Sequence, residues 1–178
     1  MSHTSLELIP LSIAVLTVSD TRNLDTDTSG ACLINALTSA GHQLAERALV
    51  KDDIYQIRAK LSDWIARPDI QVALITGGTG FTDRDSTPEA VAPLFDKCVE
   101  GFGELFRQVS FTEIGTSTIQ SRALAGLANR TLICCLPGST KACRTAWEKI
   151  LAPQLDARQG PCNFVAHLGV SPACGSRT

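Results

Sequence analysis

Residues 72–80 read Val-Ala-Leu-Ile-Thr-Gly-Gly-Thr-Gly, so a short apolar run passes directly into a glycine-rich turn. An apolar run of this length predicts a strand that is buried on both faces, as in a parallel sheet. A helix is expected to begin near Thr87-Pro88-Glu89, because proline is well tolerated in the first helical turn and Ser86 or Thr87 can cap it. The stretch therefore predicts one strand–turn–helix unit of an α/β protein.

Comparable units occur on both sides of this stretch. Residues 11–18 and 131–136 are apolar runs that predict buried strands, and residues 43–50 predict a further strand. Apolar residues at helical spacing predict helices over 33–40, from Asp53 to Pro68, and over about 141–155. Residues 100–128 predict a short helix around 102–109, followed by a loop at 115–118.

Strands that alternate with helices predict a parallel sheet with helices on its faces. Open sheets of this kind bind ligands in the crevice beyond the carboxyl ends of their strands. Three of the predicted strands end there in polar or glycine-rich turns. The candidate binding residues in these turns are Ser19, Asp20, Gly77, Gly78, Thr79, Gly80, Pro137, Gly138 and Ser139.

The composition is that of one globular domain. The chain has 178 residues, of which 44% are hydrophobic and 19% charged, and its formal net charge is -2. Because it has no dense run of Lys or Arg, nucleic acid and membrane surfaces are not expected as partners. No apolar run approaches the roughly 20 residues of a membrane helix, and the first residues lack a signal-peptide pattern, so a soluble cytoplasmic protein is expected. Residues 1–168 are expected to form the domain and residues 169–178 a loose tail.

The seven cysteines and three histidines show no metal-ligand spacing. Cys134 and Cys135 lie inside an apolar run, so they are interpreted as small buried residues of a strand. His42 and His167 have no recognisable catalytic partner and are interpreted as structural or surface residues. Scattered thiols without a secretion signal again indicate a reducing cytosol.

The turn from Gly77 to Gly80 is the most informative candidate site. Glycines let a ligand approach the main chain, and consecutive amide N–H groups in such a turn form a concave anion site. A phosphate is the natural ligand, although the stretch is neither a P-loop nor a G-x-G-x-x-G motif, because Asp83 stands where the last glycine would be. The alternative is a tight turn that binds nothing.

Charged residues follow this turn directly. Asp83 and Asp85 would repel a bare phosphate, so a ligand phosphate there needs a counterion. Mg²⁺ is the simplest one, because it binds carboxylates together with substrate phosphates and water. Arg84 could add a bidentate phosphate contact. The alternative is that these residues are solvated loop charges, with one aspartate capping the next helix; we prefer this interpretation for Asp83 and leave both open for Asp85.

Residues 137–141, Pro-Gly-Ser-Thr-Lys, open a helix with two hydroxyls and a lysine, and Arg144 lies one turn further on. They form a second candidate anion site, the alternative being an ordinary capped helix with surface cations. Two anion sites and acidic side chains at one sheet edge suit a nucleotide together with a second phosphorylated ligand.

Several of these motifs together resemble the MoaB/MogA family of molybdenum-cofactor biosynthesis proteins. They are Thr17-Val-Ser-Asp20, Gly77-Gly-Thr-Gly-Phe-Thr82, the block Arg84-Asp85-x-Thr87-Pro88-Glu89-Ala90, and Pro137-Gly138. The resemblance covers about residues 10–160. Residues 111–122, 137–147 and 161–164 are similar to the bacterial MoaB branch in particular.

The resemblance implies a three-layer α/β/α fold with a mostly parallel central sheet, and assembly into homotrimers or homohexamers. It implies binding of molybdopterin and a nucleotide, with ATP and Mg²⁺ as cofactors for adenylylation of the pterin. Two family aspartates correspond to Asp85 and Asp52, both in the catalytic role, and Asp85 would also bind the magnesium ion. Since the family's Pro-Asp-Glu reads Lys51-Asp52-Asp53 here, Asp53 stays an alternative to Asp52. The binding residues that it implies are Ser19, Asp20, Gly77, Gly78, Thr79, Gly80, Arg84, Thr87, Pro137, Gly138 and Ser139.

The chain departs from the pattern of active adenylyltransferases at two places. It has Arg122-Ala123-Leu-Ala-Gly126 where they carry Arg-Ser-Ala-Ala-Gly, and Pro137-Gly-Ser-Thr140 where they carry Pro-Gly-Asn-Pro. The alternative function is therefore a non-catalytic protein of the same pathway that binds a pterin, a nucleotide or a partner. A generic dinucleotide-binding domain is disfavoured, because the glycine pattern fails.

Overall fold

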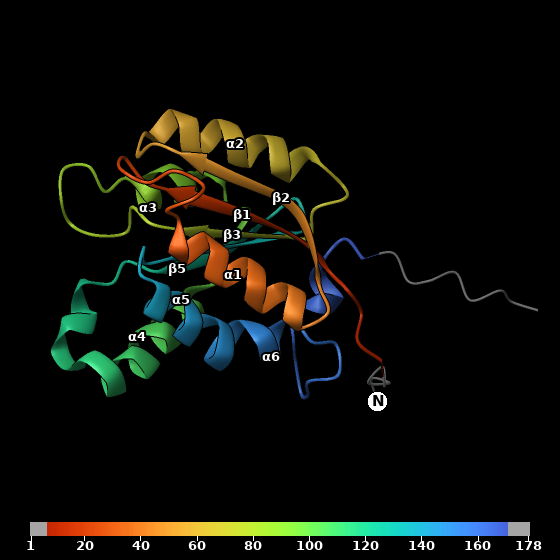
Figure 1. Ribbon diagram of the computed structural model, residues 1–178. Coiled ribbons are helices and arrows are strands. Elements are labelled where there is room, and N and C mark those ends of the chain that lie inside the picture. Colours follow the sequence, from red (N-terminus) through yellow and green to blue (C-terminus); the bar gives the residue numbers. More distant parts are fainter. Residues whose placement is uncertain (1–6, 171–178) are drawn as a thin grey trace, which may run out of the picture.

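The computed structural model describes residues 7–170 as three layers, with one sheet between two sets of helices (Figure 1). The strands are β1 (Ser12–Val18), β2 (Gln43–Val50), β3 (Val72–Thr76), β4 (Lys97–Cys98), β5 (Leu124–Ala128) and β6 (Thr131–Leu136). The helices are α1 (Thr28–Ser39), α2 (Ile54–Ala66), α3 (Thr87–Val91), α4 (Glu100–Ile114), α5 (Thr140–Ala146) and α6 (Ala152–Gln154). Short 3₁₀ segments are η1 (Ala92–Leu94), η2 (Gly115–Gln120) and η4 (Val165–His167), and η3 (Trp147–Leu151) is a π-helical segment between α5 and α6.

The sheet has six strands in the order β2-β1-β3-β6-β5-β4. The pairs β1–β2, β1–β3 and β3–β6 are parallel, whereas β5 pairs antiparallel with both β6 and β4. The register places Thr17 opposite Thr76, and Thr76 opposite Leu136, so β1, β3 and β6 end at one level. The expected mostly parallel sheet and three-layer α/β/α fold are therefore confirmed.

Each face of the sheet carries its own apolar core. On one face Leu33 of α1, Phe106 of α4 and Trp147 pack against the strands. On the other face Leu61 and Trp64 of α2 are fully buried, with α3 beside them. Parallel strands covered on both faces must be apolar throughout, which is why the continuous apolar runs predicted them.

The N-terminus of α1 is held by a buried carboxylate. The side chain of Asp27 is fully buried and accepts hydrogen bonds from the Gly30 amide (2.9 Å) and the Thr17 hydroxyl (2.7 Å). Its Oδ2 also lies 3.1 Å from Arg47 Nη2 on β2. These contacts join α1, β1 and β2, and they keep the pKa of Asp27 below its ordinary value although burial alone would raise it.

The region 97–128 is the part of the fold that the sequence describes least well. The short helix predicted around 102–109 extends over Glu100–Ile114, the loop predicted at 115–118 lies within the 3₁₀ segment η2, and β4 and β5 were not predicted. Strand β5 reads Leu-Ala-Gly-Leu-Ala, without the alternation or the β-branched side chains that mark a strand, and β4 is two exposed residues long. Strand β5 is stabilised by pairing with β6, and β4 by pairing with β5, and neither pairing is visible in the strand's own sequence.

Predictions for several single residues are confirmed. Asp53 caps α2 by accepting from the amides of Tyr55 and Gln56, and Cys134 and Cys135 are buried in β6. His42 is buried and accepts from the Leu11 amide, whereas His167 is exposed. Within residues 7–170, no helix has the length and apolar content needed to cross a bilayer. Of the expected tail 169–178, residues 171–178 lie outside the described residues.

Candidate functional site

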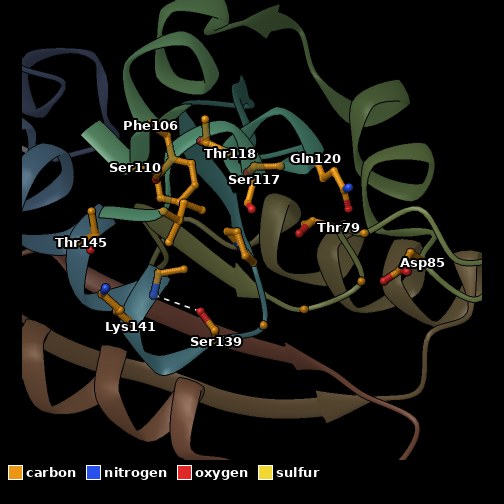
Figure 2. A pocket seen from close by; sticks show the side chains of 18 of the residues that line it. Thr79, Asp85, Phe106, Ser110, Ser117, Thr118, Gln120, Ser139, Lys141 and Thr145 are labelled. Carbon is orange, nitrogen blue, oxygen red and sulfur yellow. Dashed lines mark hydrogen bonds between the residues drawn. The ribbon is translucent and has the colours of Figure 1, made fainter. Parts of the chain in front are cut away.

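A pocket of about 540 Å³ opens at the carboxyl ends of β1, β3 and β6. Its size is typical of small-molecule sites, which span about 300–1,000 Å³. Residues of α4, η2 and α5 form the wall that faces the strand ends (Figure 2). Eight of the predicted site residues line this one pocket: Gly77, Gly78, Thr79, Gly80, Asp85, Pro137, Gly138 and Ser139.

The turn after β3 presents its backbone to the pocket. Gly77 and Gly78 have φ angles of +105° and +65°, in the left-handed region that glycine adopts readily. Thr87 holds the turn from behind, because its hydroxyl donates to the Gly77 carbonyl (2.8 Å) and its amide to the Gly78 carbonyl (2.9 Å). No acceptor within residues 7–170 takes the amide protons of Gly78 and Thr79, so both can donate to a ligand.

The loop after β6 lies directly against this turn. A Cβ on Gly138 would lie 3.2 Å from the Cα of Gly77, so a larger residue would push the two loops apart by a few tenths of an ångström. The Ser139 hydroxyl accepts from the Ala142 amide (3.1 Å) and caps α5. Ser139 also lines the pocket, and the two predicted anion sites therefore share one cavity.

Asp85 brings a carboxylate to the pocket and is ionised there. Burial by itself raises its pKa, but hydrogen bonds from Thr82 and from the Gly80 amide outweigh this effect, and the net pKa lies below the ordinary value. Its Oδ2 accepts from the Thr82 amide (2.9 Å) and hydroxyl (2.6 Å). Asp85 does not cap α3, since the N-cap residue of this helix is Ser86, whose side chain makes no capping hydrogen bond.

Asp52 lies behind the turn rather than in the pocket. It is buried, and its Oδ1 accepts from the Ser86 amide (3.0 Å) and hydroxyl. Its Oδ2 faces Gly78, because a Cβ built on Gly78 would lie 2.5 Å from that atom. The carboxylate of Asp52 therefore lies directly behind Gly78, whose amide is one of the two unpaired amides.

Comparison with known proteins agrees with this geometry. A family model described as "Probable molybdopterin binding domain" matches residues 14–157. The chain is 62% identical over 168 residues to "Molybdenum cofactor biosynthesis protein B" of Escherichia coli (strain K12), covering 94% of this chain and 99% of that one. It is 46% identical over 146 residues to the protein of the same name in Staphylococcus aureus (strain MRSA252), covering 80% and 86% of the two chains.

The chain belongs to the MoaB/MogA family. A crystal structure of molybdenum cofactor biosynthesis protein B superimposes with a TM-score of 0.80 at 42% identity, covering 83% of this chain and 92% of that one. A solved MogA structure aligns with a TM-score of 0.73 at 26% identity, over 81% and 97% of the two chains. The chain is thus a molybdenum cofactor biosynthesis protein of MoaB/MogA type.

The remaining residues that the MoaB/MogA resemblance implies surround the pocket without lining it. Arg84 points away from the turn, because its guanidinium binds both carboxylate oxygens of Asp20 (2.8 and 3.0 Å) and the Asp52 carbonyl (3.0 Å). This hydrogen bond from Arg84 is the main reason why the pKa of Asp20 is lowered. The Ser19 hydroxyl accepts from the amides of Thr21 and Arg22. Asp20 and Arg84 therefore join the loops after β1 and β3, whereas the Ser19 side chain shapes only its own loop.

Arg122 is a site residue of this MoaB/MogA chain that the sequence did not indicate as one. Its guanidinium donates to the carbonyls of Thr79 (3.4 Å) and Asp85 (3.0 Å), and it pairs with Glu89. It also lies 5.1 Å from the centre of the exposed Phe81 ring. Arg122 thus fastens both ends of the loop that carries Asp85. The motif around Arg122 differs from the active pattern by its missing serine. It does not indicate the contacts of Arg122, because these are made to backbone atoms of residues far away in the sequence.

A magnesium ion fits the donors of this site. Within residues 7–170, no three His, Cys, Asp or Glu side chains gather into a cluster that could hold a metal by themselves. Mg²⁺ does not need such a cluster, because it is usually bound by one or two carboxylates together with substrate phosphates and water. Asp85 supplies one ionised carboxylate beside the unpaired amides of Gly78 and Thr79.

Proposed function

We propose that this MoaB/MogA protein binds molybdopterin in the pocket and adenylylates its terminal phosphate with Mg²⁺-ATP. The observation that carries the proposal is the meeting of two unpaired amides, from Gly78 and Thr79, with the ionised carboxylate of Asp85 in one cavity. Such amides suit phosphate oxygens, and a carboxylate beside them suits a divalent ion that arrives with the phosphates. Membership of the family supports molybdopterin as the ligand.

The proposed reaction is an adenylyl transfer, a substitution at the α-phosphorus of ATP. An oxygen of the pterin's terminal phosphate attacks the α-phosphorus of ATP and forms a new P–O bond. The bond from the α-phosphorus to the β-phosphate breaks, and pyrophosphate leaves with the electron pair. Since such reactions need little covalent help from a protein, catalysis consists of holding the two phosphates in line and neutralising their charge.

The residues of the chain divide this work. The amides of Gly78 and Thr79 hold phosphate oxygens, and the adjoining loop of Pro137, Gly138 and Ser139 lines the place for the second phosphate group. Asp85 would hold the magnesium ion, which when bound neutralises charge on the phosphate oxygens. Arg122 keeps Asp85 in place by donating a hydrogen bond to the main-chain carbonyl of Asp85.

Pyrophosphate release from ATP and molybdopterin tests this proposal. We expect wild-type protein to release pyrophosphate, and Asp85→Asn to lower the rate at least about 100-fold while molybdopterin still binds, because the variant removes charge but little volume. Asp83→Asn is the matched control: Asp83 is exposed in the same loop and does not line the pocket, so its rate stays near wild type. Wild-type protein that binds both ligands but releases no pyrophosphate would refute the adenylylation step.

A non-catalytic binding function is the second candidate, and one observation favours it. Ala123 stands where active adenylyltransferases carry serine, and it is 3% exposed directly beside Arg122. A hydroxyl is therefore missing next to the residue that fastens the Asp85 loop. On this view the protein binds molybdopterin in calorimetry but releases no pyrophosphate, and Ala123→Ser, which returns the missing hydroxyl, should restore some release.

Assembly into homotrimers or homohexamers stays a prediction from the family resemblance. The chain mass is 19.0 kDa, so sedimentation equilibrium separates three or six copies from one without ambiguity. A monomer across the micromolar range would contradict the prediction.

A further inference from the structure

The end of the pocket away from Asp85 contains a second carboxylate, Glu113, in the last turn of α4. Its Oε1 accepts from the Thr145 hydroxyl at 2.7 Å, and its Oε2 lies 3.2 Å from Lys141 Nζ. Thr145 and Lys141 both belong to α5 and line the same pocket. Figure 2 shows them on the opposite side of the cavity from Thr79 and Asp85.

Glu113 is held as an ionised hydrogen-bond acceptor. The hydrogen bonds from Thr145 and Lys141 lower its pKa below the ordinary value, and 29% of its side chain remains exposed toward solvent and the pocket. A carboxylate has about four lone-pair sites on its two oxygens, and these two partners use one on each. Each oxygen therefore keeps capacity for one more donor, and the pair forms a fixed two-pronged acceptor.

The walls between the two ends suit a flat ring. Val18, Phe106, Ile114 and Ala142 contribute apolar surface to the lining. A ligand whose phosphate lies at the amides of Gly78 and Thr79 would extend its ring system along these side chains. Its far edge would then meet Glu113.

A pterin ring ends in an edge that matches this acceptor. Its 2-amino group and the adjacent ring N–H are two parallel donors, which a carboxylate accepts side by side, as it does with a guanidinium. Guanine carries the same edge and adenine does not. The adenine of ATP therefore gains nothing from Glu113, whereas a pterin does.

We propose that Glu113 recognises the 2-amino-4-oxopyrimidine edge of the pterin, with Thr145 and Lys141 as its positioning residues. The proposal rests on the proposed function, because it needs the phosphate of the same ligand at the glycine turn. It adds the group that selects the ring and explains why a carboxylate faces a pocket built for an anion. In this assignment Glu113 gives specificity for the ring, and charge neutralisation at the phosphates belongs to the end of the pocket that contains Asp85.

Calorimetry with a matched pair of ligands tests the assignment. The probes are 6-(phosphonooxymethyl)pterin and the corresponding lumazine phosphate, in which an oxygen replaces the 2-amino group; GMP and AMP are the nucleotide probes. Wild-type protein should bind the pterin at least about ten-fold more tightly than the lumazine, because the carboxylate would face an unpaired oxygen in the latter. AMP should gain no affinity from Glu113.

The variant Glu113→Gln should invert this preference, because an amide can donate to the lumazine oxygen and accept from its ring N–H. Its affinity for pyrophosphate, which needs only the other end of the pocket, should equal that of wild type. The matched control is Glu104→Gln, an exposed residue of α4 outside the pocket, which should keep the preference for pterin. Loss of pyrophosphate binding in Glu113→Gln would indicate a structural role and overturn the proposal.

The possible failures are distinguishable. If neither ring phosphate binds to wild-type protein, the proposed function fails and this inference fails with it. If pterin and lumazine phosphates bind equally well, only the role of Glu113 is refuted and the proposed function stands. Binding of GMP that depends on Glu113, with no binding of the pterin, would assign the pocket to a guanine nucleotide and overturn both.

Discussion

Gly78 is a position where a single methyl group would collide with two buried polar side chains behind the turn. A Cβ there would lie 2.5 Å from Asp52 Oδ2 and closer still to Thr87 Oγ1, and the φ angle of +65° is unfavourable for other residues. The residue therefore allows the turn to expose its amides on one side while two buried polar side chains pack against the other.

The variant Gly78→Ala should lower the free energy of unfolding by about 1–3 kcal/mol, because strained φ angles and displaced buried groups each cost on this order. Urea denaturation measures the change. Gly101→Ala is the control: nothing lies within 4 Å of its Cβ, and it lies in the first turn of α4. Its stability should be unchanged or up to about 1 kcal/mol higher. Equal losses in the two variants would contradict this account of the turn.

Beside the two apolar cores, a few charged side chains also join elements, and Asp27 at the start of α1 is the most buried of these. The variant Asp27→Ala should destabilise the protein by at least about 2 kcal/mol, since it removes a helix cap and leaves Arg47 without its partner. Asp53→Ala removes a solvent-accessible cap of α2 and should cost only about 1 kcal/mol. If the two losses are equal, the contacts of Asp27 with Thr17 and Arg47 contribute nothing beyond capping.

The contribution of Asp27 should also depend on pH. Its pKa in the folded protein lies below the ordinary value of 3.8, so the ionised form favours folding. This stabilisation is fully present above about pH 4 and is lost as the pH falls through the lowered folded-state pKa. The stability difference between wild type and Asp27→Asn should therefore shrink from pH 7 toward pH 2. A difference that grows on acidification would refute the assignment.

The loop from Gly80 to Ser86 is an element without regular structure, and two arginines hold it. The variant Arg122→Ala should free the loop, because it removes contacts with Thr79, Asp85 and the Phe81 ring together. Chymotrypsin should then cleave after Phe81 at least about ten-fold faster, since proteolysis follows the population of opened states. Arg158→Ala removes a surface pair with Asp156 and serves as the control with an unchanged rate. Equal cleavage rates in both variants would show that the loop needs no arginine.

At the scale of the whole molecule, the two apolar cores protect three of the thiols. Cys134, Cys135 and Cys143 are buried, whereas Cys98 and Cys162 are exposed. Burial raises the pKa of Cys143 to about 12 and that of Cys134 above its ordinary range, so little reactive thiolate forms. Peptide mapping after brief iodoacetamide treatment should find Cys98 and Cys162 alkylated, and the three buried thiols only in denaturant. Native labelling of Cys143 as fast as Cys98 would contradict the packing beneath the Pro137 loop.

The parts of the fold that could be predicted from sequence are those whose signal is local. Strands β1, β3 and β6 are continuous apolar runs, and Asp53 precedes an apolar stripe, so each indicates its own structure. Strands β4 and β5 could not be predicted, because they owe their conformation to a neighbouring strand.

The same distinction holds for the site. The glycine turn and Asp85 stand together in one motif, and their shared pocket follows from the sheet topology. Glu113 and Arg122 act through residues more than 30 positions away, Thr145 in one case and Asp85 in the other. The packing of α4 on α5 brings Glu113 to Thr145, and the packing of the segment before β5 on the loop from Gly80 to Ser86 brings Arg122 to Asp85.

The neighbouring cysteines of β6 point into different cores, Cys134 toward α1, α4 and α5 and Cys135 toward α2 and α3. A reporter at one of these two positions would thus monitor a single helical layer, while its neighbour monitors the other. The helices that line the cavity, α4 and α5, belong to the layer on the Cys134 side. Residues that pack beneath α2 can therefore change in evolution without altering the side chains that select the ligand.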